Sequence, residues 1–225
     1  MTEAAKRRQM AETVAILEGI YPEAVCALEH GGEPWRLMVM ARLSAQCTDA
    51  RVNEVCRELF ARFPTLDSLA DAPLEGIADI VRPCGLWQTK ARNIKDECRI
   101  VRDDFGGKVP DDMDSLLSLP GVGRKIANLL LGDIYGKPAI VADTHCIRIC
   151  GRLGMYPTEL KDAHKVEKIM VKLIEPEKQS DFCHRIVQFG RDVCSARAPR
   201  CGECPLAHLC AFAKGSVKQK KEKNT

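Results

Sequence analysis

The sequence predicts an all-α fold, and three observations lead to this prediction. Apolar residues recur at spacings of three and four along most of the 225 residues, which is the period of a helix with one buried face. Glycine, proline and N-capping residues interrupt these runs at short intervals, as in helices joined by tight turns. No segment alternates apolar and polar residues as a strand does, and no Asn-Gly pair marks a β-hairpin. We therefore expect about ten helices and no sheet.

Three segments show the helical pattern most clearly. The first follows Asp49, a natural N-cap, and Pro64 ends it. Gly106 and Gly107 stop the second, and the third follows Asp162. The apolar positions are Val52, Val55, Cys56, Leu59, Phe60 and Phe63 in the first segment, Ile94, Cys98, Val101 and Phe105 in the second, and Val166, Ile169, Met170, Leu173 and Ile174 in the third.

Composition argues against a membrane protein and against a secreted disulfide scaffold. No apolar run approaches the ~18 residues that a membrane span needs. The first thirty residues contain Glu3, Glu12 and Glu18 and lack the apolar core of a signal peptide, so we expect an intracellular protein. Twelve cysteines in a reducing compartment indicate free thiols or metal ligands rather than disulfides. The net charge of +3 identifies no partner.

A cysteine box, "CSARAPRCGECPLAHLC" (194–210), changes the character of the chain near its end. Its C-x6-C-x2-C-x5-C cysteines are Cys194, Cys201, Cys204 and Cys210. Four thiolates this close suit either a tetrahedral zinc ion or an iron–sulfur cluster, and the single C-x2-C pair favours the cluster. Arg197 and Arg200 lie in the first loop of the box. A metal centre that ties down this loop would hold both guanidinium groups ready to grip phosphate.

The segment Leu116–Leu131 has the pattern helix, Pro-Gly-Val-Gly turn, helix. Gly121 and Gly123 allow a sharp turn and a close approach to another surface. The second helix begins near Arg124 and Lys125, beside its most apolar stretch, and its N-terminal N–H groups form a ready site for a phosphate. Such helix-hairpin-helix elements bind the DNA backbone without reading sequence, and Lys125 could be one more phosphate contact.

Asp143 and His145 interrupt the apolar segment "VADTHCIRI", eighteen residues after Lys125. A carboxylate at this position is a helix N-cap, a functional acid or both. In a shared pocket, the amine of Lys125 could attack a sugar carbon while Asp143 stabilises positive charge or moves a proton. The alternative is a non-catalytic DNA-binding module, in which Lys125 contacts phosphate and Asp143 only caps a helix.

Five motifs together resemble the endonuclease III family, the iron–sulfur base excision DNA glycosylases of the helix-hairpin-helix superfamily. In the order and spacing of that family they are "LSAQCTD" (43–49), "CGLWQTKA" (84–91), "LPGVGRK" (119–125), "DTH" (143–145) and the cysteine box (194–210). The resemblance covers almost the whole chain outside its lysine-rich end. The combination is specific, although each motif alone is not.

The resemblance implies two helical domains with a DNA cleft between them, a helix-hairpin-helix glycosylase fold with a C-terminal iron–sulfur loop. A six-helix barrel with the hairpin would span 28–137. The segments 1–27 and 138–212 would form the iron–sulfur domain, and 213–225 would be a basic, disordered tail. The resemblance also implies a [4Fe–4S] cluster on the four cysteines of the box.

The activity implied by the resemblance is removal of oxidised pyrimidines from duplex DNA, followed by strand cleavage at the abasic site through β-elimination. Lys125 would be the nucleophile that forms a Schiff base, and Asp143 the catalytic carboxylate. Leu86 would be pushed into the base stack, Gln46 would fill the space left by the flipped nucleotide, and His145 would contact DNA. The expected partner is double-stranded DNA with damaged pyrimidines or abasic sites, bound by a cytoplasmic, nucleoid-associated monomer.

Three residues depart from the pattern of that family. Cys47 replaces a smaller residue, Ile126 stands where threonine is expected, and Ala142 stands where valine is expected. None removes a reacting group, but Ile126 and Ala142 bear on substrate preference. The nearest alternatives, adenine-mismatch and thymine-mismatch glycosylases, release a base without cutting the strand and lack the lysine. An electron carrier that uses the cluster would leave the motifs upstream of the box without a role.

Overall fold

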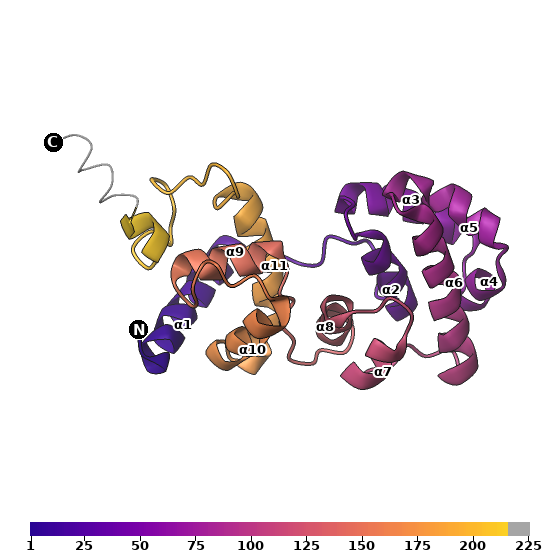
Figure 1. Ribbon diagram of the computed structural model, residues 1–225, viewed down its shortest axis with the longest axis horizontal. Coiled ribbons are helices and arrows are strands. Elements are labelled where there is room, and N and C mark those ends of the chain that lie inside the picture. Colours follow the sequence, from indigo (N-terminus) through magenta and orange to yellow (C-terminus); the bar gives the residue numbers. More distant parts are fainter. Residues whose placement is uncertain (216–225) are drawn as a thin grey trace. The chain divides into compact units, whose positions relative to one another are not determined.

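The structure is a computed structural model that describes residues 1–215 and contains two compact units. One unit is Cys26–Gly136, and the other combines Met1–Val25 with the chain from Lys137 onward (Figure 1). The regular elements of residues 1–215 are α-helices and short 3-10 helices, and none of these residues lies in a strand. The prediction of an all-α fold is confirmed.

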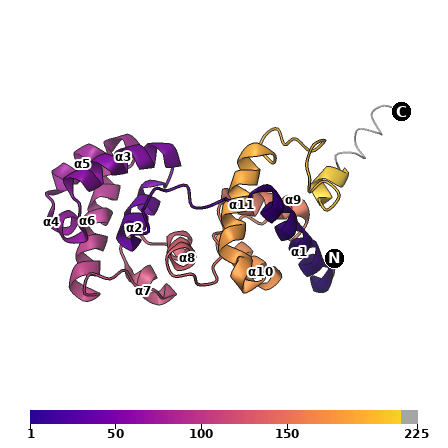
Figure 2. The ribbon, with the colours of Figure 1, turned by 180° about the vertical axis from the view of Figure 1, so that it is seen from behind.

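Seven α-helices and one 3-10 helix form the unit Cys26–Gly136, whose residues are all described. In chain order they are α2 (Pro34–Leu43), α3 (Asp49–Arg62), α4 (Leu66–Asp71), α5 (Leu74–Val81), η1 (Arg82–Cys84), α6 (Trp87–Asp104), α7 (Met113–Ser118) and α8 (Arg124–Asp133). Helix α6 packs against α4 and α5, and α2 packs against α3, α6 and α8 (Figure 2). The resemblance implied six helices here; the structure has seven α-helices, of which α4 and α7 span only six residues each.

Helix α3 begins one residue away from its predicted cap. The N-cap is Thr48 rather than Asp49, because the Thr48 hydroxyl oxygen accepts a hydrogen bond from the Arg51 N–H at 3.3 Å. Asp49 is the first helical residue, where a negative charge interacts favourably with the helix dipole. The helix ends at Phe63, directly before Pro64, as predicted.

The ends of α6 and the start of α10 (Ala163–Leu173) agree with the sequence pattern. Helix α6 stops at Asp104, and Gly106 and Gly107 then take φ values of 60° and 78°, which glycine adopts without strain. Asp162 caps α10 by accepting a hydrogen bond from the Lys165 N–H at 2.9 Å. Local signals therefore fix these boundaries.

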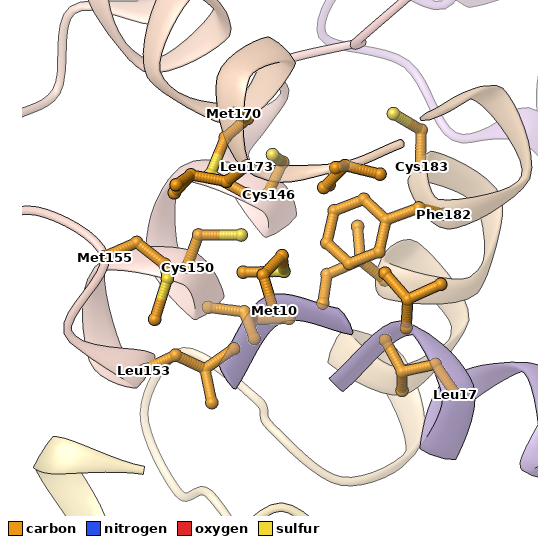
Figure 3. Packing of buried hydrophobic residues seen from close by; sticks show 14 of the residues in the cluster. Met10, Leu17, Cys146, Cys150, Leu153, Met155, Met170, Leu173, Phe182 and Cys183 are labelled. Atoms are coloured by element: carbon orange, nitrogen blue, oxygen red, sulfur yellow. The ribbon is translucent and has the colours of Figure 1, made fainter. Parts of the chain in front are cut away.

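The second unit is built from two distant parts of the chain. Its helices are α1 (Glu3–Ile20), α9 (Thr144–Leu153), α10, the 3-10 helix η2 (Pro176–Lys178) and α11 (Gln179–Asp192). Helix α1 packs against α10 and α11, and α11 also packs against α9. Figure 3 shows Met10 and Leu17 of α1 in the same fully buried cluster as Phe182 of α11. The core of this unit therefore requires its first helix.

Cysteine serves as a small apolar side chain in both units. Outside the box, the buried cysteines are Cys56, Cys84, Cys98, Cys146, Cys150 and Cys183, whereas Cys26 and Cys47 are half-buried. All twelve cysteines lie in the described part of the chain, and none of them is in a disulfide there.

The predicted disordered tail, 213–225, lies mostly outside the described residues. Its described beginning is helical rather than irregular, because 211–215 form a helical turn and Ala213 is buried against the core. Among the helices of residues 1–215, none combines the length and the apolar character needed to cross a membrane.

Candidate functional site

The predicted hairpin is present between α7 and α8 (Figure 1). The Val122 N–H donates to the Leu119 carbonyl at 3.0 Å and closes the turn. Gly121 has φ +73°, which favours glycine, and a Cβ there would lie 2.6 Å from the guanidinium carbon of Arg42, so a larger residue would also displace the Arg42 guanidinium. Gly123 is the N-cap of α8 and supplies no side-chain cap. The first turn of α8 therefore keeps the N-terminal character that favours an anion.

A buried contact between Arg42 and Glu97 lies next to the hairpin. The Arg42 guanidinium donates to the Pro120 carbonyl at 3.3 Å, and Arg42 Nε lies 3.7 Å from Glu97 Oε2. The Glu97 side chain is fully buried, and within the described structure neither of its carboxylate oxygens has a hydrogen-bond partner. Burial raises the pKa of Glu97 to about 8, although Arg42 opposes this shift. Sequence reasoning missed this pair, since nothing in either helix pattern marks the two residues as neighbours.

Lys125 is the second residue of α8, and its side chain is exposed. The buried apolar residues of α8, Ala127, Leu130 and Leu131, lie further along the helix. Arg124 is half-buried at the start of the helix. The amine is thus accessible at the end of the helix that carries the phosphate-binding character.

Asp143 is the N-cap of α9. Its Oδ1 accepts a hydrogen bond from the Cys146 N–H at 2.7 Å, and the side chain is half-buried. His145, one residue into the helix, packs directly against the backbone of Gly190 in α11, where even a Cβ would collide with the imidazole. The cap function of Asp143 is therefore a fact of the fold, and it engages only one oxygen of the carboxylate.

Gln46 and Leu86 share an unusual backbone conformation. Among residues 1–215 they are the non-glycine residues with positive φ, at 57° and 48°. This left-handed conformation costs roughly 1–2 kcal/mol for a residue with a Cβ. Both side chains are exposed, and Leu86 keeps 63% of its surface accessible. Strained backbone that carries an exposed side chain is typical of functional loops.

The cysteine box is tied to α9 by Arg152. Its guanidinium donates to Cys194 Sγ at 3.2 Å and to the carbonyls of Ser195 and Ala196 at 2.8 Å each. In return, the Cys210 thiol donates to the Arg152 carbonyl at 3.2 Å. Four cysteine sulfurs in one short segment are a donor set that soft metal centres use, so the residues of the box fit a metal centre.

Arg148, one helical turn before Arg152, holds the same loop. It donates to the Cys194 carbonyl through Nε at 3.2 Å and through Nη2 at 3.0 Å, and Nη2 also lies 3.2 Å from His145 Nδ1. Sequence reasoning overlooked both arginines. The available signal was their i, i+4 spacing on an otherwise amphipathic helix, which places both on one face.

The four thiols of the box are electrostatic neighbours. Burial raises the pKa of Cys204, and Cys194, Cys210 and Cys201 raise it further. Within residues 1–215, no three side chains of metal-ligand type converge as the ligands of a single metal ion would. The assignment of these cysteines as ligands therefore remains a prediction from their chemistry and spacing.

Arg197 and Arg200 are exposed on the loop that Arg148 and Arg152 hold. The loop is also closed internally, because the Arg200 N–H donates to the Val193 carbonyl at 2.9 Å. Their guanidinium groups therefore project from an ordered backbone, as the phosphate-gripping prediction requires.

The predicted site residues divide between the two units. Cys26–Gly136 contains Gln46, Leu86, Gly121, Gly123, Arg124 and Lys125, whereas the other unit contains Asp143, His145, Cys194, Arg197, Arg200, Cys201, Cys204 and Cys210. The first set combines loops and a helix N-terminus, and the second combines a cap with a thiol-rich loop. Each unit therefore presents its own group of candidate residues.

Two family models match the chain. The first, for the HhH-GPD superfamily of base excision DNA repair proteins, matches residues 39–176. The second, for the iron–sulfur binding domain of endonuclease III, matches residues 194–210, from the first to the last cysteine of the box. Together they cover the hairpin, Lys125, Asp143 and the thiol ligands that the sequence predicted.

Individual proteins resemble the chain over nearly its full length. Endonuclease III of Synechocystis sp. is 42% identical over 214 residues, which are 95% of this chain and 96% of that protein. A solved non-covalent endonuclease III–DNA complex has a TM-score of 0.88 at 39% identity and covers 97% of this chain and 99% of its own. A trapped endonuclease III–DNA covalent intermediate has the same TM-score and identity, with coverage of 96% and 99%.

Proposed function

The chain belongs to the endonuclease III family of base excision repair DNA glycosylases, and from this premise we propose that it removes oxidised pyrimidines and then cuts the strand. The observation that supports strand cleavage is Lys125, which places an exposed amine at the start of α8, directly after the turn of the hairpin. A structural relative has been trapped as a covalent intermediate with DNA, which supports a covalent step in this chain as well. Mismatch-specific relatives would release a base without this amine.

The proposed reaction starts with extrusion of the damaged nucleotide, because a base inside the duplex is out of reach. Extrusion costs a few kcal/mol, and a lesion that stacks poorly lowers this cost. Leu86, exposed on its strained turn, enters the stack and offsets part of the remainder. Gln46, exposed on the neighbouring strained loop, fills the vacated space opposite the orphaned base.

Lys125 then attacks C1′ of the sugar as a neutral amine. The bond from C1′ to the base breaks, the base leaves with the electron pair, and the carboxylate of Asp143 stabilises positive charge or moves a proton. The attacking nitrogen loses a proton, the C1′–O4′ bond breaks and O4′ takes up a proton, which leaves a protonated Schiff base between Lys125 and C1′. The Schiff base acidifies C2′, and loss of a proton there expels the 3′ phosphate and nicks the strand. The Asp143 side chain is held for this task because Oδ1 is fixed by the Cys146 N–H.

Borohydride trapping tests the proposal directly. The protein is incubated with duplexes that carry either an oxidised pyrimidine or an abasic site, and borohydride then reduces any Schiff base to a stable covalent adduct. We expect trapping and strand cleavage with both duplexes. Base release without any adduct would assign the protein to the mismatch-specific type, and binding without reaction would make it a non-catalytic module.

The phosphate grip predicts a salt dependence that separates two kinds of contact. For ~4–6 phosphate contacts, log affinity should fall with log salt with a slope of roughly −4 to −5. Arg197→Ala and Arg200→Ala should each flatten this slope by up to about one unit and weaken lesion and undamaged DNA alike, since phosphates carry no lesion information. Leu86→Ala is the matched control: the slope should stay and the preference for damaged DNA should fall. The opposite pattern would reverse the assigned roles.

The iron–sulfur segment predicts the colour and metal content of the protein. Its four cysteines would hold the cluster, whose role when bound is to fix the loop that carries Arg197 and Arg200. We expect brown protein with a broad absorption shoulder near ~400 nm and about four irons per chain. Cys204→Ser should lose iron, whereas Cys183→Ser, a buried thiol of the same unit outside the box, should retain it. Stoichiometric zinc without iron would contradict this prediction.

A further inference from the structure

One buried lysine connects two loops of the Cys26–Gly136 unit, the loop that contains Gln46 and the loop that contains Leu86. Lys90 lies in the first turn of α6, and 4% of its surface is accessible. Its Nζ donates to the carbonyls of Leu43 at 2.9 Å, Ala45 at 2.7 Å and Cys84 at 2.8 Å. An ammonium group has three N–H donors, so these three carbonyls satisfy it completely.

The three acceptors lie where each loop leaves regular structure. Leu43 is the last residue of α2, Ala45 directly precedes Gln46, and Cys84 is the last residue of η1, two residues before Leu86. Carbonyls at helix ends lack the partners that the helix interior provides, and a buried carbonyl without a donor is costly. Lys90 therefore supplies hydrogen-bond donors to the carbonyls at the start of both loops, and it fixes the distance between these carbonyls.

A charged group is suited to this place despite its burial. Desolvation lowers the pKa of Lys90, as expected for an ammonium group removed from water. Hydrogen bonds from a charged donor are about twice as strong as neutral ones, and the negative ends of α2 and η1 face this donor. A neutral amide could supply two of the three bonds and no charge.

We propose that Lys90 is a positioning residue that holds the backbones of Gln46 and Leu86 at the separation that base extrusion requires. It touches neither DNA nor the reacting atoms; it acts through the backbone of the two loops. A left-handed residue persists only where its surroundings over-determine it, and Lys90 is the group shared by both such residues here. This inference rests on the proposed roles of Gln46 and Leu86 in the reaction.

The effect of losing Lys90 should depend on whether the substrate still carries a base at the damaged position. An oxidised pyrimidine must be unstacked, so its removal depends on the paired action of both loops. An abasic site has no base to unstack and depends on them less. Loss of Lys90 should therefore slow lesion processing more than abasic-site cleavage, whereas general destabilisation would slow both equally.

The test compares Lys90→Met with Lys95→Met in single-turnover reactions at a temperature where both variants are folded. Lys95 is the matched control, because it lies on the same helix and donates one hydrogen bond to a backbone carbonyl, Ala72 at 2.7 Å. Lys90→Met should slow cleavage of the oxidised-pyrimidine duplex about ten- to a hundred-fold and abasic-site cleavage several-fold less. Lys95→Met should leave the ratio of the two rates unchanged. An unchanged ratio in Lys90→Met, or an equal shift in both variants, would overturn the proposal.

Two further measurements cover the remaining cases. If Lys90→Met does not fold, Lys90→Gln, which keeps two donors, should show an intermediate ratio, and a wild-type ratio would overturn the proposal. Hydrogen exchange in DNA-free protein tests the proposal without any activity. The Cys47 N–H donates to the Ser44 carbonyl at 3.1 Å, and the Gly85 N–H donates to the Arg82 carbonyl at 3.3 Å. Both amides should exchange faster in Lys90→Met or Lys90→Gln, and neither should in Lys95→Met. Unchanged exchange would count against Lys90 alone, whereas a wild-type protein inactive on both duplexes would count against the proposed function.

Discussion

Lys125→Gln should abolish both borohydride trapping and strand cleavage, the largest effect that we expect from any single substitution. The covalent step needs a primary amine, and an amide at the same place cannot form a Schiff base. Glutamine retains most of the side-chain length at this exposed helical position, so the fold should be unaffected. The measurement is the yield of DNA adduct after borohydride, beside the yield of nicked strand.

DNA binding separates loss of chemistry from loss of contact. Removing one positive charge should change the salt slope of binding by no more than about one unit, so Lys125→Gln should still bind lesion duplexes. Lys108→Gln is the matched control, because it removes an exposed lysine charge from the same unit. Normal trapping in Lys125→Gln would contradict the assignment of Lys125 as the nucleophile. An equal loss of trapping in Lys125→Gln and Lys108→Gln would indicate an effect of charge.

Asp143→Asn should slow base release by ~10² or more, on the scale expected for a positioned acid or base. The substitution should leave the helix cap intact, because asparagine is as good an N-cap as aspartate and its side-chain oxygen can still accept a hydrogen bond from the Cys146 N–H. Only the negative charge and the proton-accepting capacity are lost. The measurement is the single-turnover rate of base release, recorded beside the thermal unfolding midpoint.

Asp162→Asn provides the control for this substitution. Asp162 caps α10 through the same geometry, a 2.9 Å hydrogen bond from the Lys165 N–H, and no catalytic role is proposed for it. Both variants should keep near-native unfolding midpoints, and only Asp143→Asn should lose activity. A wild-type rate in Asp143→Asn would leave this residue as a helix cap and nothing more.

The features that could be predicted from sequence are those with a local cause. The period of the apolar residues placed α3, α6 and α10. Capping or breaking residues placed both ends of α3, the end of α6 and the start of α10 to within one or two residues. The hairpin and the cysteine box were identifiable because their residues are consecutive or closely spaced. Even the one displaced cap, Thr48 instead of Asp49, involved two neighbouring residues that are both good at capping.

The features that escaped sequence reasoning depend on partners far along the chain. Lys90 reaches a carbonyl 47 residues away, and Arg152 reaches carbonyls 43 and 44 residues away. A backbone carbonyl is present at every residue and leaves no mark in the sequence, so the acceptor could not be identified. The exposure of Lys125 could not be predicted for a related reason: the pattern shows that α8 has an apolar face but not how far along the helix burial begins.

The discontinuous unit has a consequence for the order in which the chain acquires structure. Helix α1 leaves the ribosome before the helices that it packs against, because its buried residues Met10 and Leu17 pack with Phe182, which is synthesised some 170 residues later. An isolated helix of this length is marginal in water, so α1 must wait, while the continuous segment Cys26–Gly136 has all its partners within reach. Gln9 then ties α1 to the cysteine box through the carbonyl of Leu209 at 2.8 Å. Closure of this long loop and docking of the cysteine box therefore belong to one late, high-contact-order step of folding.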